Sequence, residues 1–185
     1  LKMKDSILIH EAHSRYIPSA PLKVLFTLNA FKDKYGTFPL ETSIVKASGL
    51  SIASVQRAKK WLHDNEFIEW KRKNKRGFNS MLCYYEIKDK SYEAPPDWEK
   101  IKHYFMDAKK SKDFTADQWR FLCIMNTLRG WGFEYRVNLK PICRFLHMHI
   151  DTFKSMRDDL IEINALTEML EVTSELIYNS SETPT

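Results

Sequence analysis

The sequence predicts a mainly α-helical protein with small β-hairpins, arranged as two tandem units joined by a linker helix. Apolar residues recur at helical spacing over much of the chain. Two aromatic- and isoleucine-rich runs, 67–73 and 81–87, flank a polar turn, as the strands of an antiparallel hairpin do. The same order of elements recurs about 98 residues later. We therefore expect a first unit over 1–90 and a second unit over 114–178.

The first unit is predicted to open with a helix that has Pro21 in its first turn, extends to Tyr35 and is stopped by Gly36. A second helix is expected over 41–48. Gly49 follows it and can adopt the left-handed conformation that a tight turn between helices requires. A third helix is predicted over 52–65, with a buried stripe of Val55, Ala58 and Leu62.

Pro95 and Pro96 mark the boundary between the units, because consecutive prolines continue neither a helix nor a central strand. We expect a linker over 91–113 whose helix begins after Asp97 and runs to about Lys110. Its predicted apolar stripe comprises Trp98, Ile101, Phe105 and Ala108.

The second unit is expected to repeat the first. Its predicted elements are helices over 115–129, 139–146 and 151–163, a short strand near 133–137, and a hairpin of 166–172 with 175–178. The matched core positions are Ile44 with Ile142, Val45 with Cys143, Val55 with Phe153, Ala58 with Met156, Leu62 with Leu160 and Ile68 with Leu166. The polar tail 179–185 is expected to be disordered.

Composition excludes several classes of protein. Of the 185 residues, 43% are hydrophobic and 29% are charged, which is ordinary for a soluble globular chain and unlike a disordered or collagen-like one. No apolar run approaches the ~20 residues that cross a bilayer, and no apolar stretch near the N-terminus resembles a secretory signal. The three cysteines are odd in number and widely spaced. They predict reduced thiols in a cytoplasmic protein without membrane contact.

Charge is divided unevenly between the two halves. Residues 1–90 hold 17 Lys and Arg against 9 Asp and Glu, whereas residues 91–185 hold 12 against 15. The net charges are therefore +8 and −3. This asymmetry predicts that the first half meets a polyanion and that the second half has another role.

One stretch resembles a known family. The run 47–62 contains a small residue, Gly49, an apolar residue, Ser51, then Ser-Val-x-Arg ending at Arg57, and Leu62. With its preceding helix and following hairpin, it resembles the winged helix-turn-helix DNA-binding domains of phage and plasmid replication proteins and related bacterial regulators. The resemblance spans 19–87, about 70 of the 185 residues. It implies two tandem winged-helix domains.

The same resemblance implies sequence-specific binding of double-stranded DNA, in particular at a phage or plasmid replication origin. Two other functions stay open. A transcriptional or partitioning regulator would use the same DNA contact, because one module serves many roles. A protein-interaction scaffold would not bind DNA at all, and the basic first half argues against it.

Ten residues form the candidate DNA-binding site: Ser51, Ser54, Gln56, Arg57, Lys60, Lys71, Arg72, Lys73, Lys75 and Arg76. Ser54 and Lys60 can reach phosphates. Gln56 and Arg57 can pair with base edges, glutamine favouring adenine and arginine favouring guanine. The hairpin tip carries five cations in six residues, a density that repels itself without a polyanion nearby. The alternatives are a solvated helix face and, for the tip, a nuclear-localisation stretch or a solvated edge strand.

The corresponding surface of the second unit is acidic. Its third helix carries Asp158, Asp159 and Glu162, its hairpin 168–175 has no cation, and His147 stands where the first unit has Gly49. We therefore expect self-association or a replication-protein partner through 97–178. Four basic residues leave room for phosphate contacts elsewhere: Arg120, Arg129, Arg136 and Lys140.

No catalytic, metal or cofactor site is predicted. Cys143, His147 and His149 have ligand chemistry but no fourth ligand nearby, and His10 and His13 lack the i, i+4 spacing of zinc proteases. The chain has only five glycines and no phosphate-binding glycine-rich loop. The sequence therefore predicts a binding protein rather than an enzyme.

Overall fold

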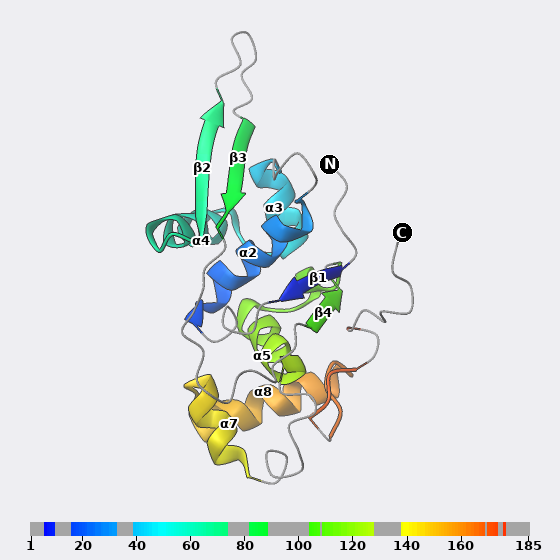
Figure 1. The fold of residues 1–185 in the computed structure, drawn as a ribbon. Coiled ribbons are helices and arrows are strands. Elements are labelled where there is room, and N and C mark those ends of the chain that lie inside the picture. The colour runs from blue at the N-terminus through cyan, green and yellow to red at the C-terminus, as the bar shows by residue number, and fades with distance from the viewer. Residues whose placement is uncertain are drawn as a thin grey trace.

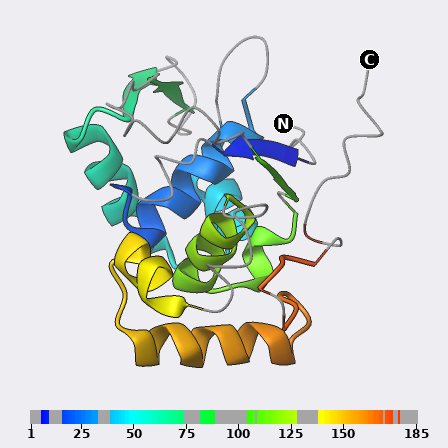
Figure 2. The same ribbon diagram turned by 60° about the horizontal axis from the view of Figure 1, so that its bottom comes forward.

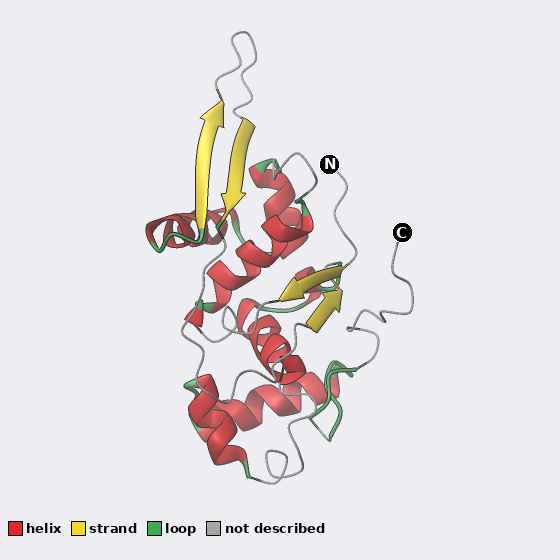
Figure 3. Ribbon diagram, in the orientation of Figure 1, coloured by secondary structure: helices red, strands yellow, loops and turns green. Residues whose placement is uncertain are grey.

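The computed structural model describes residues 6–9, 16–32, 39–73, 82–88, 104–107, 109–127, 138–168, 170–173 and 176. The described chain is mainly helical and has two small antiparallel sheets of two strands each (Figures 1 and 3). The predicted mainly helical class is confirmed at this level. No helix among these residues is long and apolar enough to cross a membrane.

The first unit consists of three helices followed by a hairpin. The helices are α2 (Ser19–Ala30), α3 (Glu41–Ser48) and α4 (Ile52–Asp64), and the strands are β2 (Ile68–Lys73) and β3 (Leu82–Ile87). Helix α2 ends five residues before Tyr35, to which the predicted helix extended. The backbone N–H of Lys32 bonds to the carbonyl of Asn29, three residues back, and this tightens and closes the last turn. Gly36, the predicted stop, lies outside the described residues.

The turn between α3 and α4 requires glycine for two reasons. Gly49 has a φ of 69° and a ψ of 10°, the left-handed conformation, and its N–H donates to the Val45 carbonyl. A Cβ atom at this position would lie 2.6 Å from the carbonyl oxygen of Lys112. After the turn, the hydroxyl of Ser51 accepts the N–H of Ser54 and caps α4.

The second unit repeats the helices of the first. The 3₁₀ turn η2 (Ser111–Asp113) precedes α5 (Ala116–Thr127), α7 (Leu139–Leu146) and α8 (Ile150–Glu162). Helices α3 and α4 begin 98 residues before α7 and α8, as predicted. The predicted strand near 133–137 and the tail 179–185 lie outside the described residues.

Backbone details also recur at this offset. His147 has a φ of 50° where Gly49 has 69°, and Asn164 has 56° where Glu66 has 61°. Of the matched core positions, Val45 and Met156 are only half-buried, and the others are buried. The repeat therefore lies in backbone geometry and core positions rather than in residue identity.

Besides the end of α2, two sequence predictions are wrong. Residues 104–107 form strand β4 (Tyr104–Asp107), not the end of a linker helix, and β4 pairs antiparallel with β1 (Ser6–Ile9). The apolar spacing around Phe105 suited a helix, but a distant strand supplies the hydrogen bonds and Met106 is fully buried. The part of that helix predicted over 97–103 lies outside the described residues.

The second error concerns the hairpin of the second unit. Leu166 and Val172, expected on one strand, face each other in a single bridge. The backbone N–H of Thr167 donates a hydrogen bond to the carbonyl of Glu171, and the N–H of Leu170 donates one to the carbonyl of Thr167. Leu170 has a φ of 60°, which reverses the chain within four residues. The hairpin is therefore much shorter than the one in the first unit.

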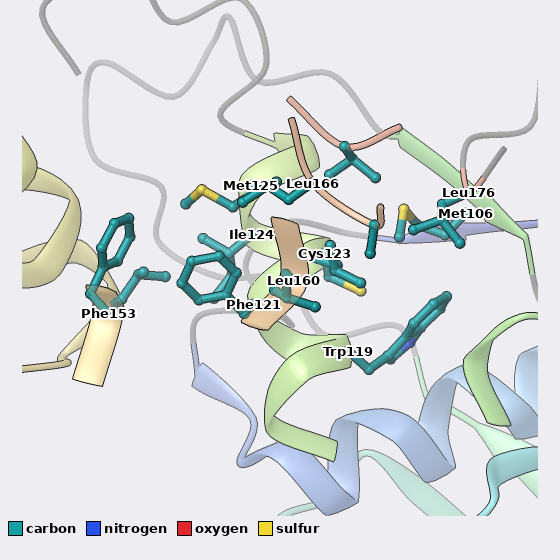
Figure 4. Packing of buried hydrophobic residues seen from close by; sticks show 14 of the residues in the cluster. Met106, Trp119, Phe121, Cys123, Ile124, Met125, Phe153, Leu160, Leu166 and Leu176 are labelled. Carbon is teal, nitrogen blue, oxygen red and sulfur yellow. The ribbon is translucent and has the colours of Figure 1, made fainter. Parts of the chain in front are cut away.

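The two units share a core along the contact of α2 with α5. Phe26 of α2 meets Trp119 of α5 edge-to-face, with 5.2 Å between ring centroids. On the other side of α5, Phe121 packs on Phe153 of α8, also at 5.2 Å (Figure 4). Trp119 is fully buried. Helix α5 thus lies between α2 and α8 and joins the units through apolar packing (Figure 2).

A buried lysine lies at this junction. Lys23 of α2 is fully buried and donates a hydrogen bond to the carbonyl of Phe114. Burial lowers the pKa of Lys23 to about 8, although the charge of Asp113 opposes that shift.

Candidate nucleic-acid interface

Helix α4 presents its polar face to solvent. Its apolar face, with Val55 and Leu62 fully buried, packs on α2 and α3. The opposite face exposes Ser51, Ile52, Ala53, Gln56, Arg57 and Lys60, and Ser54 is half-buried. The structure therefore brings the five predicted residues at or on α4 to one side of the helix.

The two serines at the start of α4 are linked to Arg57. The Ser51 hydroxyl donates to the Ser54 hydroxyl at 2.9 Å, and the Ser54 hydroxyl accepts from Arg57 Nη2 at 3.4 Å. The second bond is long and lies at the surface. Arg57 can therefore leave Ser54 for a stronger acceptor such as a guanine edge or a phosphate at low cost.

Gln56 is held by an acid that the sequence analysis did not single out. Its Nε2 donates to Glu41 Oε1 at 2.9 Å, and Lys59 Nζ donates to the other carboxylate oxygen at 2.7 Å. Glu41 is the first residue of α3. One carboxylate therefore ties α3 to two positions of α4 and must release Gln56 before Gln56 can pair with a base.

Lys59 belongs to the packing of the hairpin rather than to the outer face. Its ammonium lies 5.3 Å from the Tyr85 ring centroid and 5.8 Å from that of Trp70. Burial opposes the charge, but hydrogen bonds to Glu41 and Tyr85 outweigh burial and raise the pKa of Lys59. Lys59 therefore stays charged and fixes β2 and β3 on α4.

Lys60 is exposed and pairs with Asp64 one turn later. The hydrogen bond from Lys60 lowers the pKa of Asp64. A surface pair of this kind is weak and screened by salt. A phosphate can therefore replace Asp64 as the partner of Lys60.

The hairpin carries the remaining predicted residues. Lys71, Arg72 and Lys73 lie at the far end of β2, where their Cα partners on β3 are Tyr84, Cys83 and Leu82. Lys75 and Arg76 lie outside the described residues. The strands extend from α4 at the end of the molecule opposite to α7 and α8 (Figure 1).

Sequence reasoning missed three residues around this surface. Glu41 is separated from its partners by 15 and 18 residues, so no local pattern shows the contact. Lys59 was assigned neither to the apolar stripe nor to the exposed face of the predicted helix. Ile52 is 53% exposed at the start of α4, and its place outside the apolar stripe was the available signal. An exposed aliphatic side chain there can contact a thymine methyl group.

The equivalent helix of the second unit has a different surface. Asp158, Asp159 and Glu162 are exposed on α8, and Arg157 pairs with Asp158 at 2.7 Å. His149 caps α8 by accepting the N–H of Asp151. No cluster of three potential metal ligands occurs within the described parts of the chain.

Comparisons with known proteins identified no relative. No family model matches the chain, and neither the curated proteins nor the solved structures contain a significant match.

Proposed function

We propose that the protein binds double-stranded DNA in a sequence-specific manner through α4 and the β2–β3 hairpin. The observation that carries this proposal is the arrangement of α3, the glycine turn and α4, with an exposed polar face on α4 and a basic hairpin directly after it. This order of helices and strands supports the proposal, because it is the order expected of a winged helix, in which the last helix lies in the major groove.

In this proposal α4 reads bases and the hairpin binds the backbone. Arg57 and Gln56 lie on the exposed face of α4 and contact base edges. Lys60 and the cations of the hairpin tip contact phosphates and hold the register. The second unit, whose helices repeat the same order, is proposed to be a second winged helix whose acidic face does not contact DNA.

The salt dependence of the DNA affinity tests the proposed contacts between basic side chains and phosphates. About five phosphate contacts predict that log affinity falls with log salt at a slope near −4 to −5. The triple change Lys73→Glu, Lys75→Glu and Arg76→Glu should weaken binding to all sequences alike and flatten the slope. Binding measured by fluorescence anisotropy at several salt concentrations checks this. A slope near zero for the unchanged protein would refute the proposal.

A matched triple change separates local contacts from net charge. Lys140, Arg144 and Lys154 are exposed on α7 and α8, at the end of the molecule opposite to α4 and the hairpin (Figure 1). Their reversal to Glu changes net charge by the same amount as the hairpin triple. It should alter the affinity far less. Equal losses in the two triples would show a diffuse charge effect rather than a hairpin contact.

The biological role proposed with this contact is origin binding in phage or plasmid replication. It is supported by the resemblance of 47–62 to the domains of such initiators. Footprinting on DNA of the replicon that encodes the protein tests it. Protection of iterated repeats at the origin supports an initiator, whereas protection of a promoter alone supports a transcriptional regulator.

A further inference from the structure

The two units differ most where their hairpins cover the third helix. In the first unit the N–H of Lys88 returns to the carbonyl of Phe67 after 21 residues. In the second unit the equivalent bond runs from Thr173 to Ala165 after only eight residues. The second unit therefore has the backbone bond that closes the base of the hairpin, but its hairpin is much shorter than that of the first unit.

The long hairpin covers a face of α4. Tyr85 of β3 is buried there, and the ring of Trp70 on β2 lies 4.7 Å from that of His63 on α4. The equivalent face of α8, around Arg157 and Ile161, borders a hollow of about 650 Å³. A surface that the first unit covers with its own strands therefore has no strand over it within the described part of the second unit.

The hollow combines apolar and acidic groups. Leu139, Ile161 and Leu170 are half-buried and supply apolar surface. Asp158, Glu162 and Glu168 are exposed around it, and Arg157 is already paired with Asp158. Three acids against one arginine leave a net negative rim. Such a surface suits a segment that carries several cations beside an apolar or aromatic side chain.

The chain itself contains such a segment. Residues 71–78 carry Lys71, Arg72, Lys73, Lys75 and Arg76, and they end at Phe78. In both Figure 1 and Figure 2 strands β2 and β3 lie at the opposite end of the molecule from α8, so these strands are remote from the hollow of their own chain. We propose that the hollow binds the basic hairpin tip of a second copy of this chain.

This contact joins different surfaces of the two copies and is therefore head-to-tail. It also uses the same cations that DNA would use, a consequence that rests on the proposed function. DNA should then compete with the second copy for the hairpin tip. The free protein would associate, and binding to a short DNA duplex would separate the copies.

Sedimentation velocity on nuclease-treated protein at 50 mM and 500 mM salt tests the association directly. We expect association at low salt that is lost at high salt. The double change Asp158→Lys and Glu162→Lys should weaken it at least tenfold. As a matched control, Asp159→Lys with Asp117→Lys makes the same charge change at exposed residues that do not line the hollow, and it should weaken association far less. A protein that stays monomeric at both salts, or equal effects of the two doubles, would overturn the proposal.

A charge exchange tests the pairing itself. The hairpin triple Lys73→Glu, Lys75→Glu and Arg76→Glu should abolish self-association, and mixing it with the Asp158→Lys, Glu162→Lys protein should restore heterologous association. No association in the mixture would refute the pairing. Monomeric Asp158→Lys, Glu162→Lys protein should keep its DNA affinity, because these residues lie far from α4. That measurement distinguishes failure of this inference from failure of DNA binding. Circular dichroism of each variant checks that the helices are intact.

Discussion

The two units have nearly the same helical backbone and opposite surfaces. Helices α4 and α8 have the same length, the same relation to the preceding turn and buried residues at matched positions, such as Leu62 and Leu160. Their outer faces differ: Lys60 corresponds to Asp158 and Arg57 to Ser155. The difference shows that a few buried positions and one left-handed turn specify the fold, whereas exposed positions are free to define what each unit binds.

The largest expected effect tests whether the two cores are equivalent. Leu62 and Leu160 are both fully buried at matched positions. Leu62→Ala and Leu160→Ala should each lower the free energy of unfolding by about 2–5 kcal/mol, because each leaves a cavity. Chemical denaturation followed by circular dichroism measures this. A loss below about 1 kcal/mol at only one position would show that the repeat is not energetically symmetric.

The next effect tests the difference between the exposed faces. Arg57→Ala should cost about 1–3 kcal/mol of binding free energy on the specific DNA site and much less on random DNA. Its counterpart, Ser155→Ala on α8, should leave both affinities unchanged. Titrations with specific and random duplexes measure the two losses. Equal losses for Arg57→Ala on both duplexes would assign Arg57 to phosphate contact and leave Gln56 as the reader.

An effect of similar size, here on the free energy of unfolding, is expected at the turns that precede α4 and α8. Gly49→Ala places a Cβ against the Lys112 carbonyl and strains a left-handed residue, so it should destabilise the protein by about 1–3 kcal/mol. His147→Gly relieves the strain of a non-glycine residue at a φ of 50° and should change stability by less than about 1 kcal/mol. Thermal unfolding of the two variants and of the unchanged protein measures both changes in stability. A larger loss for His147→Gly would mean that its imidazole has a structural role without parallel at Gly49.

The most gradual effect, spread over more than two pH units, concerns Lys23 between the units. Its pKa is about 8 in the folded protein and near 10.5 when unfolded, so the unfolded state binds more protons between these values. Stability should therefore rise as pH increases from about 8 to 10.5, by at most about 1.4 kcal/mol per pH unit. Lys23→Met should remove that rise. Denaturation midpoints of both proteins across this range provide the measurement, and identical slopes would contradict the prediction.

Local signals in the sequence predicted the elements that local forces determine. The bounds of α3 and α7, the start of α4 and the left-handed Gly49 follow from apolar spacing, capping and turn chemistry within a few residues. The pairing of β1 with β4 joins segments about 100 residues apart, and no local pattern contains it. The positions of Arg57, Gln56 and Lys60 on one face were predictable from helical spacing.

The partners of these side chains were less predictable. Glu41 binds Gln56 and Lys59 only because α3 and α4 cross at that point. The shortened hairpin depends on the left-handed conformation of Leu170. Because leucine rarely adopts this conformation, its presence in the sequence does not predict a tight turn there. The roles of the ten residues in DNA binding stay predictions.

The pairing of β1 with β4 also has a consequence for synthesis on the ribosome. Strand β1 is translated about 100 residues before its partner at 104–107. At a translation rate of about 5–20 residues per second, the backbone groups of β1 stay without their strand partner for roughly 5–20 s. Trp119, which closes the contact with α2, arrives later still. During this interval the unpaired edge of β1 in the nascent first unit is accessible to other chains or to chaperones. The first unit therefore completes its fold only after the second unit has begun to emerge from the ribosome.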